Sequence, residues 1–509
     1  MAVAIPLIVA VTGHRDIAAG ADASLRERFG ELIDQLARQY RWTPLTLLCG
    51  LRPGAEILAA EEALARGIPV IAALPMARER YEATFNQQEV ARFRAVLAQC
   101  ERVETVGAEL PVHLAYYGDI VVLFWDGVEG SDETIAEVVT MRKSGIPSRH
   151  AILGTYVPDV GPAYQIVTPR EGQPAPRGAF TLEPRCPDRF DGDKTCEHDF
   201  LAALDRYNDF DRDLSATPGD ARTTSLADLM KRIDGAANRL QIWHLRIVQG
   251  LYILAFLAGA AQLVNEGPRG LEIKLGVLAL AFACFVVARR FDFENRYQDY
   301  RALAEALRVQ QAWRAAGLHL RVESEYLRMQ QDELSWIRMA LRTIYLLYVH
   351  DSHLEKNPAA VSGWIDDQRT YYANATHRQQ QLARRYIVLG RMLTFLALAF
   401  SIPAAVALLM KYPGPWTPSL TSVPVAVAAL AALLLRFYVQ QRGFQENARR
   451  YHHMLFVFDY AQRRIAGMDS TSPKDAYDKT VGDLGKEALA EHASWLVLHR
   501  ERPLNFVAT

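Results

Sequence analysis

Three short segments in the N-terminal part of the chain combine glycines with charged side chains, a combination that suits an anionic ligand. The first segment, Thr12–Asp16 (TGHRD), directly follows an apolar run. Its Gly13 allows a ligand to approach the backbone closely, and Arg15 offers a bidentate donor for phosphate or carboxylate. His14 and Asp16 complete the predicted ligand-binding loop. The alternative interpretation is that Arg15 and Asp16 pair with neighbouring side chains.

The second segment, Cys49–Glu56 (CGLRPGAE), precedes a helical pattern. It places Gly50 and Gly54 where the N-terminus of a helix would face a ligand, and such termini attract anions. Glu56 falls in the first turn of that helix, where the helix dipole alone also favours a carboxylate. We expect all three residues to contribute to the ligand site, although glycines are common in any tight turn between a strand and a helix.

The third segment runs from Trp125 to Glu137 and contains Asp126 and Gly127 directly after an apolar run. Thr134 and Glu137 follow at the start of a helical pattern, one turn apart and on the same face. This spacing predicts a ligand contact at Thr134. A threonine three residues before a glutamate is also typical of a helix capping box, and the sequence leaves both interpretations open.

The elements that must position these segments are strands and helices in alternation. The predicted strands are Ile5–Thr12, Leu45–Cys49, Pro69–Leu74, Arg102–Val106 and Asp119–Trp125. They alternate with helical patterns, which cover Ala23–Gln39, Ala55–Arg66 and Phe85–Cys100 and resume near Thr134. This order predicts a Rossmann-like open parallel α/β sheet. Ligands bind outside the carboxyl ends of the strands in such sheets, and the three polar segments lie at those ends.

Four apolar segments follow later in the chain as two close pairs. They are Ile247–Val264, Leu271–Ala288, Met392–Met410 and Ser419–Leu435. Each is about as long as the roughly 17–25 residues that a helix needs to cross a bilayer, and none carries a central charge. Basic residues flank the outer ends of both pairs, such as Arg289 and Arg290 after the second segment. The positive-inside rule therefore predicts two transmembrane hairpins with both termini cytoplasmic. The alternative is four buried helices of a soluble bundle.

These patterns divide the chain into five parts. We predict an α/β domain over 1–156, a linker or extended hairpin with a helix over 157–224, and a first two-helix membrane module over 225–320. A cytosolic helical connector follows over 321–385, and a second membrane module with a C-terminal cytosolic helix covers 386–509. A long helix over Phe291–Ala316 is expected to extend the second span without a break. Phe293 with Tyr300 is loosely echoed by Phe444 with Tyr451, which indicates an internal duplication.

Composition excludes several classes of function. A formal net charge of −1 disfavours a nucleic-acid partner. The five cysteines are odd in number and form no CxxC pair; they are Cys49, Cys100, Cys186, Cys196 and Cys284. We therefore expect no disulfide framework, no metal site and a reducing compartment. No cofactor is predicted.

Residues 5–156 resemble the SLOG superfamily, a group of nucleotide-ligand domains related to the Lonely-guy proteins. The resemblance rests on the Gly13–Asp16 and Gly50–Glu56 segments, the strand Asp119–Trp125, and Thr134 with Glu137. In Lonely-guy enzymes a PGG-x-GT-x-x-E motif cradles a nucleotide phosphate, and its glutamate assists hydrolysis of the base–ribose bond. Here Glu129–Thr134 reads EGSDET, with acidic side chains where backbone amides should meet phosphate. The resemblance implies a nucleotide-like ligand with altered phosphate contacts rather than the same hydrolysis.

The membrane part resembles the SLATT family of two-helix membrane effectors, through its paired spans and the polar helix over 289–317. Together the two resemblances imply an effector of bacterial anti-phage defence at the inner membrane. Its SLOG domain would recognise a nucleotide second messenger, and its helices would then assemble as a homo-oligomer that permeabilises the bilayer. Two alternatives stay open. One is a membrane-anchored N-glycosidic-bond hydrolase that uses Arg15 and Glu137, and the other is a ligand-free membrane scaffold.

Overall fold

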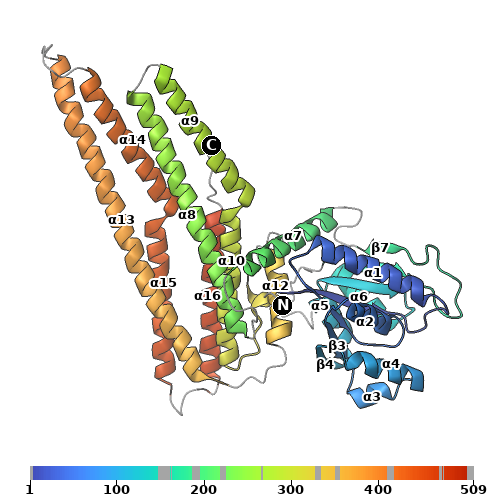
Figure 1. The fold of residues 1–509 in the computed structure, drawn as a ribbon. Coiled ribbons are helices and arrows are strands. Elements are labelled where there is room, and N and C mark those ends of the chain that lie inside the picture. Colours follow the sequence, from blue (N-terminus) through green and yellow to red (C-terminus); the bar gives the residue numbers. More distant parts are fainter. Residues whose placement is uncertain are drawn as a thin grey trace. The chain divides into compact units, whose positions relative to one another are not determined.

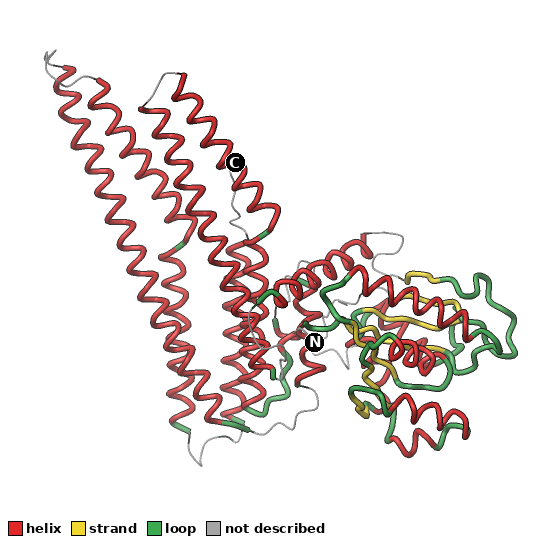
Figure 2. The backbone as a smooth tube through the Cα atoms, in the orientation of Figure 1, coloured by secondary structure: helices red, strands yellow, loops and turns green. Residues whose placement is uncertain are grey.

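The chain folds into two compact units, which we describe separately. The computed structural model describes residues 4–146, 161, 163–185, 195–217, 225–264, 268–326, 334–349, 356–409, 418–468, 473 and 475–500. The α/β unit comprises residues 1–232 and 321–352, and the helical unit comprises residues 233–320 and 353–509. All strands among the described residues lie in the α/β unit, as Figure 2 shows in yellow.

The α/β unit is built on a seven-stranded sheet with the order β4-β3-β2-β1-β5-β6-β7. Figure 1 labels its two edge strands, β4 and β7. The strands are β1 (Leu7–Gly13), β2 (Leu45–Cys49), β3 (Val70–Leu74), β4 (Arg102–Thr105), β5 (Ile120–Trp125), β6 (Ala163–Val167) and β7 (Leu182–Arg185). All neighbouring strands pair in parallel except β6 and β7, which are antiparallel. Every residue of β1, β2, β3 and β5 is buried, as a parallel sheet covered on both faces requires. The open parallel α/β sheet predicted from sequence is confirmed.

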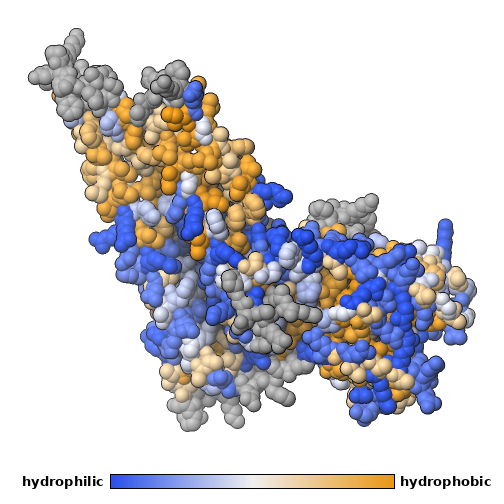
Figure 3. All heavy atoms as spheres, in the orientation of Figure 1, coloured by the Kyte–Doolittle hydropathy of each residue, from blue (hydrophilic) through white to orange (hydrophobic). Residues whose placement is uncertain are grey.

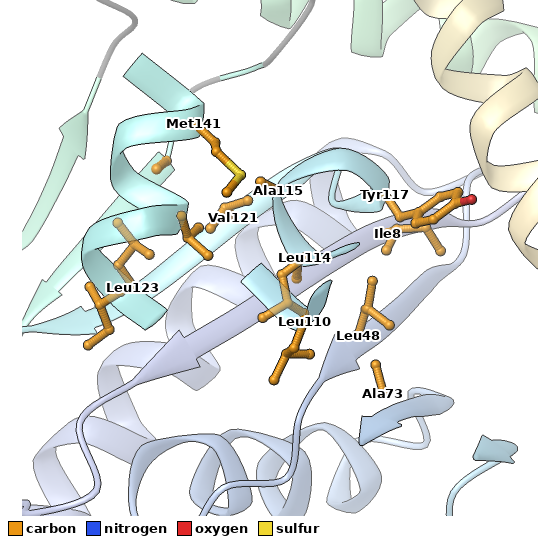
Figure 4. Packing of buried hydrophobic residues seen from close by; sticks show 14 of the residues in the cluster. Ile8, Leu48, Ala73, Leu110, Leu114, Ala115, Tyr117, Val121, Leu123 and Met141 are labelled. Atoms are coloured by element: carbon orange, nitrogen blue, oxygen red, sulfur yellow. The ribbon is translucent and has the colours of Figure 1, made fainter. Parts of the chain in front are cut away.

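Short helices connect and cover these strands. They are α1 (Asp22–Gln39), α2 (Ala55–Ala65), α3 (Arg78–Glu82), α4 (Gln87–Leu97), η1 (Gly107–Glu109), α5 (Leu110–Tyr117), α6 (Glu133–Ser144), α7 (Thr195–Ser215), α11 (Val322–Glu325) and α12 (Ser335–Tyr348). On one face of the sheet, Leu110 and Leu114 of α5 and Met141 of α6 belong to one buried cluster with Val121 and Leu123 of β5 (Figure 4). Leu346 of α12 belongs to the same buried cluster. Part of the predicted 321–385 connector therefore contributes to the core of the α/β unit.

The sheet continues into the range where we predicted a linker or extended hairpin. The predicted domain boundary at residue 156 itself lies outside the described residues. Beyond it, β6 pairs with β5 and β7 returns alongside β6 as an antiparallel edge strand. Both strands are short and stand in a Pro- and Gly-rich range, so their apolar content gives a weak strand signal. The hairpin interpretation fits this pair of strands, which belong to the sheet.

In the part of the helical unit that the structure describes, four helices are long and apolar enough to span a membrane. Its helices are α8 (Leu226–Val264), α9 (Pro268–Phe291), α10 (Phe293–Ala315), α13 (Pro358–Leu409), α14 (Pro418–Arg442), α15 (Phe444–Ala466) and α16 (Ala476–Arg500). Residues 226–232 at the start of α8 belong to the α/β unit. The predicted spans fall within α8, α9, α13 and α14, except that Met410 lies outside the described residues. Residues 501–509, the end of the predicted second membrane module, also lie outside the described residues. Large apolar side chains cover these helices, including Phe395 at 70% and Met392 at 64% exposure. Figure 3 shows them as an orange surface that gives way to blue further along the same helices.

The long helix predicted over Phe291–Ala316 is interrupted. α9 ends at Phe291, Asp292 adopts the left-handed conformation with φ 47°, and α10 begins at Phe293. Aspartate tolerates this conformation when its side chain bonds locally, and Asn295 Nδ2 donates to Asp292 Oδ1 at 2.8 Å. Gly443, with φ 55°, separates α14 from α15 in the same way. The two modules thus share a backbone break at corresponding positions, and the internal duplication stays a prediction.

Asp119 provides a test of how the sheet is stabilised. Its Oδ2 accepts the Ile8 N–H at 2.9 Å and the Thr343 hydroxyl at 3.4 Å, and burial raises the pKa of Asp119 to about 7. Because the folded protein binds this proton more tightly than the unfolded chain, ionisation of Asp119 lowers the free energy of unfolding between about pH 4 and about pH 7.

We expect Asp119→Asn, which keeps an acceptor, to reduce the loss of thermal stability from about pH 5 to about pH 8 by a few degrees. Melting curves of the full chain in detergent at the two pH values measure this. The exposed Asp22→Asn should leave the pH dependence unchanged. An identical pH dependence in Asp119→Asn and the unmodified protein would contradict the role assigned to this carboxyl group.

Candidate functional site

The three polar segments lie together at the carboxyl ends of β1, β2 and β5. The chain builds the sheet outward from β1 to β4 and then returns to place β5 on the other side of β1. The crevice between β1 and β5 is therefore the topological switch point, where open α/β sheets bind ligands. Ala55 N donates to His14 O at 3.0 Å, and Asp126 N donates to His14 Nε2 at 3.1 Å. His14 thus connects all three segments.

Two of the predicted glycines are required by the close packing of these segments. A Cβ atom on Gly13 would lie 2.6 Å from Ala55 Cβ, well inside van der Waals contact. Gly54 has φ 93°, and a Cβ atom there would lie 2.7 Å from His14 O and closer still to Arg15 O. These positions need glycine because of backbone approach within the protein.

Arg52 forms hydrogen bonds with residues of all three segments. Its Nη1 lies 2.8 Å from Asp132 Oδ2, and its Nη2 donates to Gly13 O. Its backbone N–H donates to Glu56 Oε2 at 3.0 Å. We did not single out Arg52 or Asp132 from the sequence, although both stand inside segments that we did identify. The position of Arg52 between Gly50 and Gly54, in a turn predicted to bind an anion, could have identified it.

Glu56 lies beneath the site instead of on its surface. Its side chain is 1% exposed and accepts the Thr12 hydroxyl at 3.0 Å together with the Arg52 N–H. Burial raises the pKa of Glu56, and the nearby Arg52 guanidinium opposes that shift. Nearby, a Cβ atom on Gly50 would lie 3.0 Å from Glu56 Oε2. Glu56 therefore holds the Gly50–Gly54 turn in place.

A second network surrounds His14. Burial lowers the pKa of His14, so the neutral ring accepts the Asp126 N–H at Nε2. Arg170 lies after β6 and bonds to Asp16 Oδ2 at 2.8 Å and to Asp126 Oδ2 at 3.4 Å. The sequence analysis missed Arg170 because it falls in the range predicted as a linker. Gly127 follows Asp126 with φ 87°, which turns the chain toward α6.

Arg15 is the most exposed of the site arginines. Its side chain is 45% exposed, lies 2.7 Å from Glu89 Oε2 and donates to Thr84 O at 3.2 Å. Asp16 in turn pairs with Arg170. The alternative interpretation of this segment, in which Arg15 and Asp16 pair with neighbouring side chains, is therefore what the structure shows.

The start of α6 differs from the capping-box interpretation. The helix begins at Glu133, and the Asp132 side chain accepts the Ile135 N–H at 3.1 Å as its N-cap. Thr134 is thus the second helical residue, and a capping box formed by Thr134 and Glu137 is wrong. Within the described part of the chain, neither side chain forms a hydrogen bond or ion pair with the loops of the site.

The arrangement provides three arginines, Arg15, Arg52 and Arg170, at one edge of the sheet. Each is paired with a carboxylate, and together they could receive a phosphate-bearing ligand by exchanging partners. The described residues contain no group of three or more His, Cys, Asp or Glu side chains that could hold a metal ion. Cys49, Cys100 and Cys284 are free thiols.

Substitution of Gly54 tests the packing of the site. Gly67 has φ 70° and open space around its missing Cβ, whereas Gly54 combines positive φ with a clash. We expect Gly67→Ala to lower the stability by roughly 1 kcal/mol through backbone strain, and Gly54→Ala to lower it by several times that amount. Chemical denaturation in detergent measures both. Equal losses would show that the three segments do not pack as described.

Comparison with protein-family models gives no match, and comparison with curated proteins gives no significant match.

Proposed function

We propose that this protein is a membrane effector whose α/β unit senses a nucleotide-derived ligand and whose apolar helices permeabilise the membrane in response. The observation that carries the proposal is the gathering of three arginines at the switch point of an open parallel sheet, in a chain with four helices apolar enough to span a membrane. The SLOG and SLATT resemblances point in the same direction.

The arginines suit the phosphate groups of a nucleotide. A guanidinium group offers parallel N–H donors that match a phosphate oxygen pair. The pair between Arg15 and Glu89 is partly exposed, and such pairs contribute only about 0–1 kcal/mol. A ligand phosphate therefore replaces the carboxylate at little cost. Arg170 offers the same exchange, because its partner Asp16 is also substantially exposed.

The apolar helices permeabilise the membrane in this proposal. Gly259 of α8 packs so closely on Leu430 of α14 that a Cβ atom would clash, so small residues bring these helices together. The basic last turn of α9, with Arg289 and Arg290, favours a cytoplasmic location for the adjoining polar helix. The proposal locates the protein in the bacterial inner membrane with both termini in the cytoplasm, the compartment in which nucleotide messengers occur. The pore in this proposal is formed by a homo-oligomer.

The hydrolase alternative has less support from the geometry. It requires Arg15 and Glu137 to act on one substrate. Arg15 is held by Glu89 and by the Thr84 carbonyl group, and no hydrogen bond or ion pair joins Glu137 to the site loops among the described residues. A base-release assay on nucleoside monophosphates, repeated with Glu137→Ala, distinguishes this alternative.

Thermal denaturation of the full chain in lipid nanodiscs tests ligand binding. We expect at least one member of a panel of cyclic nucleotides and ADP-ribose derivatives to raise the melting temperature, because a ligand at 100 times its Kd stabilises a protein by about 2.7 kcal/mol. Arg15→Gln and Arg170→Gln should weaken that ligand about tenfold or more, since each removes a charge-assisted hydrogen bond.

Arg66→Gln is the matched control. Arg66 pairs with Asp34 at the opposite end of α2, so its replacement should leave ligand affinity unchanged. A panel without any stabilising member would instead favour the ligand-free scaffold. Equal losses of ligand affinity in Arg66→Gln and Arg15→Gln would show that the ligand does not bind in the β1–β5 crevice.

A further inference from the structure

The helical unit contains its own cavity, outside the apolar spans. Its volume is about 800 Å³, within the range of small-molecule sites, and its wall is formed by α8, α10, α13, the last residue of α14, α15 and α16. We propose that this cavity binds a second ligand, an organic anion of nucleotide size that carries a planar ring. This site is separate from the β1–β5 crevice, and its argument uses only residues of the helical unit.

Most carboxylates on the wall are already neutralised. Asp234 Oδ1 lies 2.6 Å from Arg301 Nη1, and Glu305 pairs with both Arg301 and Arg308. Glu491 lies 3.3 Å from Arg450, which does not line the cavity. Burial raises the pKa of Glu491, which further reduces its tendency to carry charge. These acidic groups therefore do not make the cavity a site for a cation.

The net charge of the remaining wall residues is positive. Arg378 and Arg442 line the cavity, and neither has a carboxylate within ion-pair distance among the described residues. Asp367 is the remaining acidic side chain of the wall. It stands on α13 eleven residues before Arg378, about 16 Å along the helix axis. The parts of the wall formed by Arg378 and by Arg442 are thus suited to an anion.

Two polar atoms of the wall lack the hydrogen bonds that buried groups normally have. Arg442 Nε and Gln379 Oε1 are buried, and neither forms a hydrogen bond with any described residue. Buried polar atoms in proteins are nearly always hydrogen-bonded. Arg442 Nε is a donor and suits the anionic group of a ligand. Gln379 Oε1 is an acceptor and suits a ligand hydroxyl or amine.

Aromatic side chains supply the surface for a planar ring. The ring centroids of Tyr371 and Tyr372 on α13 lie 6.3 and 6.1 Å from that of Tyr451 on α15. The Arg301 guanidinium lies 5.9 Å from the Tyr371 ring. Stacking of a base on an aromatic side chain contributes about 1–3 kcal/mol and needs no particular base. The wall therefore offers both arginines and aromatic rings to an anion that carries a planar ring.

The position of Arg442 links this cavity to the membrane part. Arg442 is the last residue of α14 and directly precedes Gly443, the left-handed residue before α15. Its guanidinium lies 5.8 Å from the ring of Phe444, the first residue of α15. A ligand bound by Arg442 would therefore contact the backbone break that separates an apolar helix from its polar continuation.

Energy transfer from tryptophan to methylanthraniloyl-ADP tests the proposal, because Trp364 and Trp495 line the cavity. The full-length Arg15→Gln variant in nanodiscs is the starting protein, so that the β1–β5 crevice contributes little. We expect saturable transfer that ADP competes for more strongly than adenosine or pyrophosphate, each of which offers only one of the two required features. The transfer signal reports binding in the cavity of the helical unit. It is therefore expected even if ADP does not bind to the β1–β5 crevice of the α/β unit.

Arg442→Gln should weaken the probe about tenfold or more, and Gln379→Glu should weaken it by adding a second unpaired carboxylate to the wall. Arg436→Gln is the matched control, because Arg436 stands on the same helix and does not line the cavity. Circular dichroism checks that each variant is folded. Transfer that is not saturable, or that is the same in Arg442→Gln, Gln379→Glu and Arg436→Gln, would overturn the proposal.

Discussion

The outward-facing apolar side chains of α8, α9, α13 and α14 are the constraint on which the rest of the helical unit depends. Moving one large apolar side chain out of water is worth about 1.5–3 kcal/mol, and these helices expose many of them, with Phe395 among the most exposed. Such helices require an apolar environment along their apolar halves. Their continuations instead carry ion pairs, such as Arg301 with Asp234 and Arg369 with Asp459, which require water or a polar interior. The left-handed residues Asp292 and Gly443 mark the change from one environment to the other.

In both units, arginines gather where the chain offers a natural site. In the α/β unit they lie at the switch point of the sheet, and each forms an ion pair with a carboxylate, as Arg15 does with Glu89. In the helical unit they line a cavity between helices, where Arg442 has no such carboxylate partner among the described residues. The first site suits an exchange of partners, and the second suits direct binding. We therefore propose two places at which an anionic ligand acts on this chain.

The sequence predicted the α/β sheet well because four of its strands, β1, β2, β3 and β5, are largely apolar and fully buried, as parallel strands covered on both faces are. It also predicted that the segments at Gly13, Gly50 and Asp126 would meet, because the carboxyl ends of parallel strands share one edge. It missed Arg170 because β6 is short and stands among prolines and glycines. The break at Asp292 was missed because aspartate gives little signal for a left-handed residue inside a helical pattern. The packing of Leu346 on the sheet depends on a long-range contact that local patterns do not reveal.

Ligand-dependent leakage tests the central claim most directly. The full chain is reconstituted in dye-loaded liposomes, and the panel of cyclic nucleotides and ADP-ribose derivatives is added to the side that carries the α/β unit. The account predicts that dye release requires the nucleotide that stabilises the protein, is lost in Arg15→Gln and is retained in Arg66→Gln. Release that is independent of every nucleotide in the panel, or equal in Arg15→Gln and the unmodified protein, would contradict it.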